Sequence, residues 1–537
     1  MKTKEIIKYS VLGLLLVFYL FYGIDKCGLF DEDEAYYSEV AREMVETGNI
    51  FVPQFNYLPF LHKPVLYYWF AGISYKILGV TEFASRMPSV VFMFLLFGIT
   101  YYFSRKLFDK SIGIMAAVIL ATNVEAIVVG KAATMDTLMV LTMTCAIFSF
   151  MTAYFNNKKK YYLWFYVFSA LATLTKGPFG IVIPFMIVVT FLTICKDLRK
   201  VKEMQLLKGL GIFLLISLPW YIIVSVATNG YFIKDFFLYH NITRFSSSFE
   251  GHSGNVFYYF FVILFGFFPW SGFLPAGIFR MIQRDKKTLL IFLWAVIPFI
   301  FFTIAQTKLP NYIFPVFVPI SIMVANWWNS YFKTERYYKK EISLALLLLS
   351  VVAFSFGILF GLNEQLINIA RTNFSNPFLS EHVSLGIPAI LLSVFLVIYT
   401  GSIYFCFKIK RKVEAFIVIV SGMFIFNFIF SGYVMPAGWK IMQGPITDLT
   451  LEAKSNMKDN DTLIVYALQQ PSVVFYSRHK TVFLSEEEKY RFECILLNNQ
   501  TIGVKTFVLT QKRLVDNLLS YDVNIRKESG GYILLEN

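Results

Sequence analysis

The chain has 537 residues, of which 57% are hydrophobic and 16% are charged, and it carries a formal net charge of +14. This composition excludes an ordinary soluble globular domain and is typical of an integral membrane protein. The basic residues lie in short clusters between apolar runs, which indicates membrane topology and argues against a nucleic-acid-binding surface.

Apolar runs dominate the chain up to Val434. The first run, 6–23, follows Lys2 and Lys4, and no small-x-small cleavage motif follows it, so we interpret it as an uncleaved anchor rather than a signal peptide. Further runs are long enough to cross a hydrocarbon core of about 30 Å. We therefore expect about thirteen transmembrane helices, the others at 85–103, 111–130, 136–155, 161–175, 178–195, 207–227, 256–279, 288–305, 311–330, 342–361, 384–407 and 413–434.

The loops between these runs alternate in charge. If the amino terminus is cytoplasmic, the inner loops are basic, as in NNKKK at 156–160 and KIKRK at 408–412. The opposite loops, such as 25–84 and 228–255, have far fewer Lys and Arg per residue. The positive-inside rule then predicts a multi-pass protein of the inner (cytoplasmic) membrane, with these opposite loops and the carboxyl-terminal tail on the extracytoplasmic side.

The tail changes character after Trp439. The short runs TLIVYA, SVVFYS, KTVFLS, KTFVLT and GYILLE are β-branched and bounded by polar residues, which predicts strands, and TDLTLEAKSNM between them predicts a helix. We therefore expect a transmembrane domain at 1–438 and a small soluble external α/β domain at 439–537. The five cysteines are scattered and form neither a disulfide framework nor a metal-binding motif.

Ionisable residues point to the external edge of the membrane. They are costly inside a bilayer and mark function there, yet the centres of the predicted spans contain almost none. A proton-coupled transporter would place its site near the midplane. This distribution favours a site at the rim, although a flippase or transporter with an external gating cluster remains an alternative of a different class.

The first external loop holds six carboxylates between Leu29 and Met44. The stretch DEAYYSEVAREMVETGNI has apolar positions at helical spacing and ends at Gly48, which predicts an amphipathic helix on the membrane surface, and 65–80 predicts a second interfacial helix. Asp33 and Glu34 would lie in the first turn, where the helix dipole favours negative charge, so a plain acidic helix start is one interpretation. Glu32, Glu39 and Glu43 are expected to solvate this helix.

Several motifs carry a resemblance to known transferases. The order D-E-A-x-Y-x-E and then K-P-x-L-Y-Y-W, followed by RMPSVVF, MDTLM, TKGPFGIVIP, HNITRF, FPWSGFLP and TKLPNYIFPVFVP, covers about residues 1–330. It resembles the bacterial aminoarabinose (4-amino-4-deoxy-L-arabinose) lipid A transferases and the wider family related to protein O-mannosyltransferases. The resemblance implies the C-type glycosyltransferase fold and an inverting transfer of a sugar from polyprenyl (undecaprenyl) phosphate to an external acceptor, lipid A or another envelope glycolipid. A protein O-glycosyltransferase with the same donor class is the enzyme alternative.

The same resemblance implies roles for single residues. Asp33 would lie near the anomeric carbon with Glu34 beside it, where a carboxylate can accept the proton of the incoming hydroxyl or stabilise developing positive charge. A departing lipid phosphate needs cations and hydrogen-bond donors. This implies a phosphate-binding set of Lys63, Arg244, Tyr312 and Lys308, with Lys176 as a weaker candidate, although lysines at helix ends also snorkel.

A sugar or acceptor pocket and a metal site are further expectations. Asp136 either pairs with a cation or lines the pocket, whose other implied members are Tyr37, His240, Asn241 and His252. His62 stands where the family often has an acidic residue. Since His62 and His240 are both imidazoles, they could share a divalent metal ion, and we expect no other cofactor.

Overall fold

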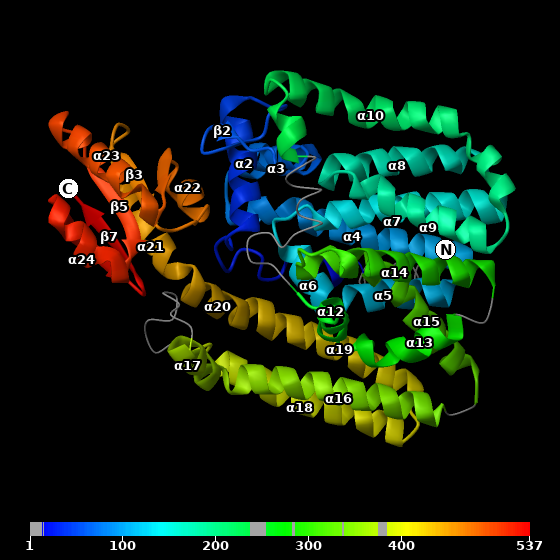
Figure 1. Cartoon of the computed structure of the whole chain (residues 1–537). Coiled ribbons are helices and arrows are strands. Elements are labelled where there is room, and N and C mark those ends of the chain that lie inside the picture. Colours follow the sequence, from blue (N-terminus) through cyan, green and yellow to red (C-terminus); the bar gives the residue numbers. More distant parts are fainter. Residues whose placement is uncertain (1–12, 14, 237–253, 282–284, 336–337, 374–383) are drawn as a thin grey trace.

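The computed structural model describes residues 13, 15–236, 254–281, 285–335, 338–373 and 384–537. Figure 1 shows a bundle of long helices that run in roughly the same direction, with the carboxyl-terminal sheet domain at one end of the bundle beside helices α2 and α3. This arrangement places the first loop of the sequence between the bundle and the sheet. The first predicted apolar run, 6–23, lies partly outside the described residues, which include Gly13 and continue from Leu15.

Eight helices of the described chain are long and apolar enough to cross a membrane. They include η4, the 3-10 turn Pro310–Val316 that continues into α15, and η6 and α20, which extend α19. The other bounds are α4 (Glu82–Leu107), α7 (Asp136–Asn156), α10 (Leu206–Ala227), α14 (Lys286–Ile304), α15 (Phe317–Lys333), α16 (Lys339–Gly361), α18 (Ile387–Lys408), α19 (Lys412–Ile429), η6 (Phe430–Val434) and α20 (Met435–Met442).

Two of the predicted spans, 111–130 and 256–279, are each formed by a bent pair of helices. Helices α5 (Lys110–Ala121) and α6 (Val124–Lys131) meet at 65° because Asn123 starts a new helix, its side chain accepting from Ala126 N. Helix α12 (Tyr258–Gly266) and the segment Trp270–Met281, made of η3 and α13, meet at 113° across Pro269, which has no N–H to continue a helix. Counting each pair as one span gives up to ten.

Two more predicted spans are helices that are shorter than the eight. Helix α8 is Lys160–Lys176 and has 17 residues, and α9 is Phe179–Ile194 and has 16. The predicted total of about thirteen spans is therefore made up of α8 and α9, the first apolar run at 6–23, and the up to ten spans that qualify by length and composition. The short helix α17 (Asn363–Asn373) follows α16.

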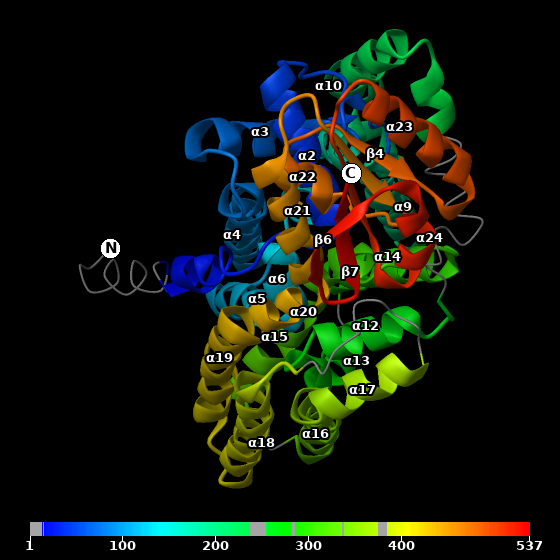
Figure 2. The ribbon, with the colours of Figure 1, turned by 90° about the vertical axis from the view of Figure 1, so that its left-hand side faces the viewer.

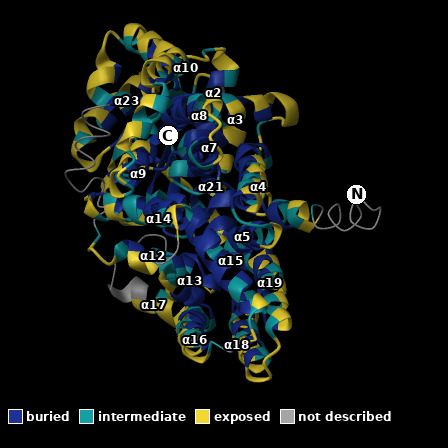
Figure 3. Ribbon diagram, turned by 90° about the vertical axis from the view of Figure 1, so that its right-hand side faces the viewer, coloured by how far each residue is buried: buried dark blue, intermediate teal, exposed yellow. Residues whose placement is uncertain are grey.

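Burial separates the centre of the bundle from its periphery. The most apolar window of α7 is 89% buried and that of η4 with α15 is 94% buried, whereas the values are 28% for α16 and for α18 and 17% for α10. In Figure 3 the buried residues gather on α7, α5 and α15, and exposed residues cover the outer faces of α16, α18 and α10. Helices α7, η4 and α15 therefore form the interior that can carry a protected site. Helices α10, α16 and α18 present apolar side chains outward, as lipid-facing helices do.

The first loop forms α2 (Asp33–Thr47), a two-stranded hairpin of β1 (Gln54–Phe55) and β2 (Leu58–Pro59), and α3 (Leu66–Leu78). Helix α2 ends at Gly48 in the left-handed conformation, φ 72°, as the sequence predicts. The expectation that Glu39 and Glu43 solvate an exposed helix is wrong, because both side chains are fully buried. Arg42 compensates this burial: it binds Glu39 through two nitrogens, Nε at 2.8 Å and Nη2 at 2.6 Å.

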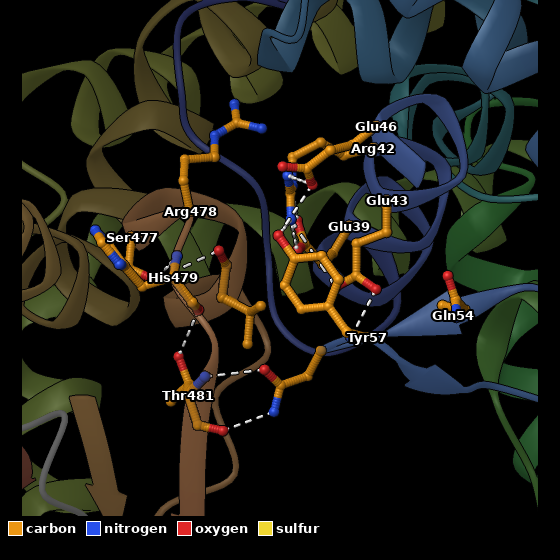
Figure 4. Close-up of polar contacts among 12 residues, drawn as sticks. Glu39, Arg42, Glu43, Glu46, Gln54, Tyr57, Ser477, Arg478, His479 and Thr481 are labelled. Atoms are coloured by element: carbon orange, nitrogen blue, oxygen red, sulfur yellow. Dashed lines mark hydrogen bonds and ion pairs between the residues drawn. The ribbon is translucent and has the colours of Figure 1, made fainter. Parts of the chain in front are cut away.

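Figure 4 shows this charged cluster of α2 facing the segment Ser477–Thr481 of the carboxyl-terminal domain. Arg42 also binds Glu46, and Tyr57 N donates to Glu43 Oε2 at 2.8 Å. Asn56 joins the hairpin to the domain through two hydrogen bonds with the Thr481 backbone, at 2.6 and 2.9 Å. Helix α2 is therefore an interior element between two domains, which explains why its polar residues are paired.

The tail folds as an α/β domain with a five-stranded sheet in the order β4-β3-β5-β7-β6. Strands β4, β3 and β5 are parallel, and β7 runs antiparallel to β5 and β6. Figure 2 shows α21 and α22 between the sheet and α2. The bounds are α21 (Gly444–Asn456), β3 (Thr462–Tyr466), α22 (Ser472–Ser477), β4 (Thr481–Leu484), α23 (Lys489–Thr501), β5 (Thr506–Gln511), α24 (Val515–Leu518), β6 (Asn524–Ser529) and β7 (Tyr532–Glu536).

Four of the five predicted strands and the predicted helix are confirmed. SVVFYS is wrong as a strand, since it forms α22, the crossover between the parallel strands β3 and β4, and Pro471 directly precedes its first turn. Strand β6 was missed because its sequence NIRKES is polar and mostly exposed.

Candidate active site

A cavity opens among the helix ends that lie nearest the first loop. It encloses about 720 Å³ of empty volume, part of it open to solvent. Its lining contains both polar and aromatic or aliphatic side chains, which suits a ligand with a charged head and an apolar body. The polar lining comprises His62, Lys63, Asp136, Lys176, Thr307, Asn311 and Tyr312, and the apolar lining includes Met139, Val140, Phe179, Phe236, Phe301, Phe302 and Pro315.

Asp136 is the centre of a network that joins three elements. Its Oδ1 forms an ion pair with Lys176 Nζ, and its Oδ2 accepts from Asn311 Nδ2 at 2.8 Å. Lys176 Nζ also lies 4.8 Å from the ring centroid of Tyr312. Asp136 begins α7 and Lys176 ends α8, so each charge complements the dipole of its own helix. The network therefore fixes both helix ends and η4 at the wall of the cavity.

Asp33 lies in the first turn of α2 and is half-buried. Its Oδ1 accepts a hydrogen bond from Tyr37 Oη at 2.8 Å, and its charge acts on Lys176 and on the phenol of Tyr68. Burial, and then the Asp33 carboxylate, raise the pKa of Tyr37 well above its usual value, so this phenol keeps its proton and stays a donor. Asp33 is not among the residues that line the cavity, and its carboxylate is held by one neutral donor, the phenol of Tyr37.

Glu34 is turned toward α4 rather than toward the cavity. Its carboxylate accepts from Arg86 Nε at 3.0 Å and Nη2 at 2.8 Å, and from the backbone N–H groups of Phe30 at 3.0 Å and Ala133 at 2.6 Å. Burial raises the pKa of Glu34, but Arg86 outweighs it and holds the pKa below its usual value. With four donors on its two oxygens, Glu34 supports the loop, which does not fit the expected second catalytic role.

The phosphate-binding role stays a prediction, and the structure places only some of the expected residues. Lys63, His62 and Tyr312 line the cavity. Lys308 is buried beside it and donates to Ala305 O, and burial lowers the pKa of Lys308. Arg244, His240, Asn241 and His252 lie outside the described residues.

The metal expectation stays a prediction. Among the residues that the structure describes, no group of three or more His, Cys, Asp or Glu side chains is placed to hold a metal ion. His62 lines the cavity, but its expected partner His240 is not among them.

Two residues of this region were missed at the level of sequence. Asn311 stands between Lys308 and Tyr312 in TKLPNYIF, and an asparagine at the mouth of an apolar run was a usable signal. Arg86 opens the apolar stretch RMPSVVF, and a charge at the end of a span requires a partner. Its fully buried guanidinium finds that partner in Glu34.

Known proteins share parts of this sequence. Residues 62–223 match the family model described as dolichyl-phosphate-mannose-protein mannosyltransferase. The undecaprenyl phosphate-alpha-4-amino-4-deoxy-L-arabinose arabinosyl transferase 2 of Proteus mirabilis is 30% identical over 325 residues, 59% of this chain and 58% of that protein. The corresponding transferase of Yersinia pestis is 28% identical over 326 residues, again 58% of its length. The similarity thus spans less than two thirds of these curated relatives.

Solved structures extend the likeness in fold to the whole chain. The crystal structure of ArnT from Cupriavidus metallidurans bound to undecaprenyl phosphate has a TM-score of 0.82 at 20% identity, covering 100% of this chain and 98% of that one. The oligosaccharyltransferase of Archaeoglobus fulgidus in its apo form has a TM-score of 0.54 at 13% identity, covering 96% and 70%. The chain is therefore a multi-pass membrane protein with the C-type glycosyltransferase fold, similar in sequence to the aminoarabinose transferases and protein mannosyltransferases.

Proposed function

We propose that the protein is an inverting glycosyltransferase that moves a sugar from polyprenyl (undecaprenyl) phosphate to an acceptor at the extracytoplasmic face of the inner membrane. The observation that carries this proposal is one cavity, lined by polar and apolar side chains, that gathers the Asp136–Lys176 pair and Lys63 of the first loop, the loop that also carries Asp33. The ArnT structure bound to undecaprenyl phosphate, which shares this fold, supports the same donor class.

In this mechanism Asp33 is the base. The acceptor oxygen forms a bond to the anomeric carbon while the bond from that carbon to the phosphate oxygen breaks, which inverts the configuration through an oxocarbenium-like state. Asp33 takes the acceptor proton, and Tyr37 keeps the carboxylate oriented. The phosphate leaves as an anion and needs no general acid if cations hold it, a role we assign to Lys63, Arg244 and Tyr312, with Lys308 beside them.

The proposal also assigns the residues that shape the sugar pocket and those of a metal site. Asp136 and Tyr37 would shape the sugar side of the cavity, with His240, Asn241 and His252 from the adjoining loop. A divalent metal ion at His62 and His240 would add positive charge for the phosphate.

The acceptor separates two versions of the proposal. An envelope glycolipid such as lipid A is the first, supported by the names of the curated relatives as 4-amino-4-deoxy-L-arabinose transferases. Protein is the second, supported by the match of residues 62–223 to the protein mannosyltransferase model. A phosphate group on the acceptor would need no deprotonation, so dependence on Asp33 is itself informative.

The test is sugar transfer in proteoliposomes loaded with labelled polyprenyl-phosphate sugar, with lipid A and a peptide offered as separate acceptors. Asp33→Asn keeps the shape of the side chain and is expected to lower transfer to a hydroxyl acceptor by about 10²-fold, as loss of a general base does. Glu32→Gln is the matched control on the neighbouring exposed residue. Near wild-type transfer by well-folded Asp33→Asn rejects the assignment, and movement of the lipid across the bilayer without transfer favours a flippase.

A further inference from the structure

The backbone just before Asp33 is held by residues from the far end of the chain. Leu29 N donates to Tyr476 Oη at 2.8 Å, and Leu29 O accepts from Trp439 Nε1 at 3.0 Å. Leu29 is fully buried, so its two backbone polar groups are satisfied by these side chains and are shielded from bulk water. Residues more than four hundred positions away in the sequence thus fix the entry to the first loop.

A second contact lies two residues before Asp33. The carboxylate of Asp31 accepts from Ser472 N at 2.8 Å and from Ser472 Oγ at 2.5 Å, at the first turn of α22. Gly28 shows how closely the domain approaches: a Cβ atom there would lie 2.3 Å from Trp439 Cζ2 and 2.5 Å from Tyr476 Oη. These contacts leave no room for the segment to shift toward the sheet domain.

The bundle holds the same segment from the other side. Arg86 of α4 donates to the carbonyl oxygens of Ile24, Cys27 and Gly28 at 2.7 to 2.8 Å, and it binds Glu34 just after Asp33. The Asp33 backbone is therefore bracketed by fixed points at Leu29, Asp31 and Glu34. Two of these three points depend on the sheet domain.

We propose that the carboxyl-terminal domain positions the reacting carboxylate through a loop clamp, which is formed by Ser472 and Tyr476 of α22 together with Trp439 of the adjoining helix α20. This inference rests on the proposed function of Asp33. No member of the loop clamp lines the cavity, so these are positioning residues that act through the backbone of residues 29–31. Misplacement of a reacting group by about 1 Å can cost 10²-fold in rate, which makes such a clamp a determinant of turnover rather than of donor binding.

Tyr476→Phe is the most selective perturbation, because it keeps the ring and removes only the phenol oxygen, which accepts from the Leu29 N–H and also interacts with Glu82. Burial, and then nearby Glu82, raise the pKa of Tyr476 above its usual value, so the native group is a neutral phenol and phenylalanine preserves its shape and charge. Trp439→Phe removes the other partner of Leu29 and keeps an aromatic ring at Gly28. Tyr490→Phe is the matched control, since Tyr490 is 80% exposed in the same domain.

The experiment combines hydrogen–deuterium exchange of the peptide that contains Leu29 with steady-state kinetics of sugar transfer, all in the full-length protein. We expect Tyr476→Phe and Trp439→Phe to accelerate exchange of this peptide by roughly tenfold or more and to lower kcat by about 10-fold to 10²-fold with KM for the donor lipid unchanged. Tyr490→Phe should match the wild type in both. If Tyr476→Phe does not fold, Trp439→Phe carries the test.

Three outcomes overturn the clamp. The first is unchanged exchange of the Leu29 peptide in both variants, and the second is accelerated exchange with an unchanged kcat. The third is a rise in KM with kcat retained, because the domain would then serve donor binding. If the wild type transfers no sugar from any polyprenyl-phosphate donor, the proposed function fails separately. The exchange measurement then decides alone whether the domain fixes the loop.

Discussion

Glutamine in place of Glu34 is expected to destabilise the fold by about 3 kcal/mol or more. The native pair is buried, with side-chain exposures of 1% for Arg86 and 6% for Glu34. All five N–H groups of Arg86 have acceptors: two Glu34 oxygens and the carbonyls of Ile24, Cys27 and Gly28. The variant would leave this guanidinium as a buried charge without a counter-ion.

The magnitude follows from what glutamine can and cannot replace. Its amide oxygen can still accept, but its NH₂ group would face donors, Arg86 and a backbone N–H, where the carboxylate oxygen had accepted. Breaking a buried ion pair on one side costs about 3–5 kcal/mol. Three backbone carbonyls remain around the guanidinium, which places the expected loss at the lower end, roughly a 10²-fold change in the folding equilibrium.

Thermal and denaturant unfolding in detergent measures this loss, with Glu46→Gln as the matched control on the same helix. Glu46 also pairs with an arginine, but its side chain is 50% exposed, so its removal should cost no more than about 1 kcal/mol. Arg86→Lys should lose about as much folding stability as Glu34→Gln, because lysine has three donors and lacks the planar guanidinium fork. Equal stability of Glu34→Gln and Glu46→Gln would refute the reasoning.

Two further outcomes are expected. Lys63→Ala should weaken polyprenyl-phosphate binding by about 1.5–3 kcal/mol, roughly tenfold to hundredfold, through loss of a charge-assisted hydrogen bond; unchanged affinity in a lipid-binding titration would reject this role. Burial raises the pKa of Asp31 from 3.8 to about 7, so the native state holds a proton that the unfolded state has lost across that interval, and stability should fall as the pH rises through it. The melting temperature of Asp31→Asn should therefore change less with pH over the same window than the melting temperature of the wild type.

The sequence could predict the elements of the first loop but not the directions of its side chains. The helical spacing of the apolar residues and Gly48 were enough to place α2, and the motif D-E suggested a catalytic pair. Neighbouring residues of a helix point about 100° apart. Asp33 therefore binds Tyr37 while Glu34 turns toward Arg86, and only the tertiary structure shows which neighbour each carboxylate contacts.

The errors in the remaining elements have a common cause. Hydrophobic runs give length and polarity, yet a short buried helix such as SVVFYS has the same composition as a buried strand. The need for a crossover between parallel strands decided this case. Pro269 and Asn123 were readable as helix interruptions, whereas the 113° and 65° angles that follow from them depend on packing.

The acidic stretch Leu29–Met44 shows why a carboxylate count does not identify a site. Arg86 and two backbone donors occupy Glu34, and Ser472 binds Asp31. Glu39 and Glu43 lie against one arginine, and burial, then Glu39, raise the pKa of Glu43 above its usual value.

Asp33 differs from these carboxylates in its surroundings. Its one hydrogen-bond donor among the described residues is the neutral phenol of Tyr37, and its charge reaches the cavity lysine Lys176. A base must be free to take a proton while it remains oriented, and a carboxylate bound by an arginine or by several amides has lost that freedom. The residues that surround Asp33 in the sequence are therefore required to hold the loop, and this leaves Asp33 available for the reaction.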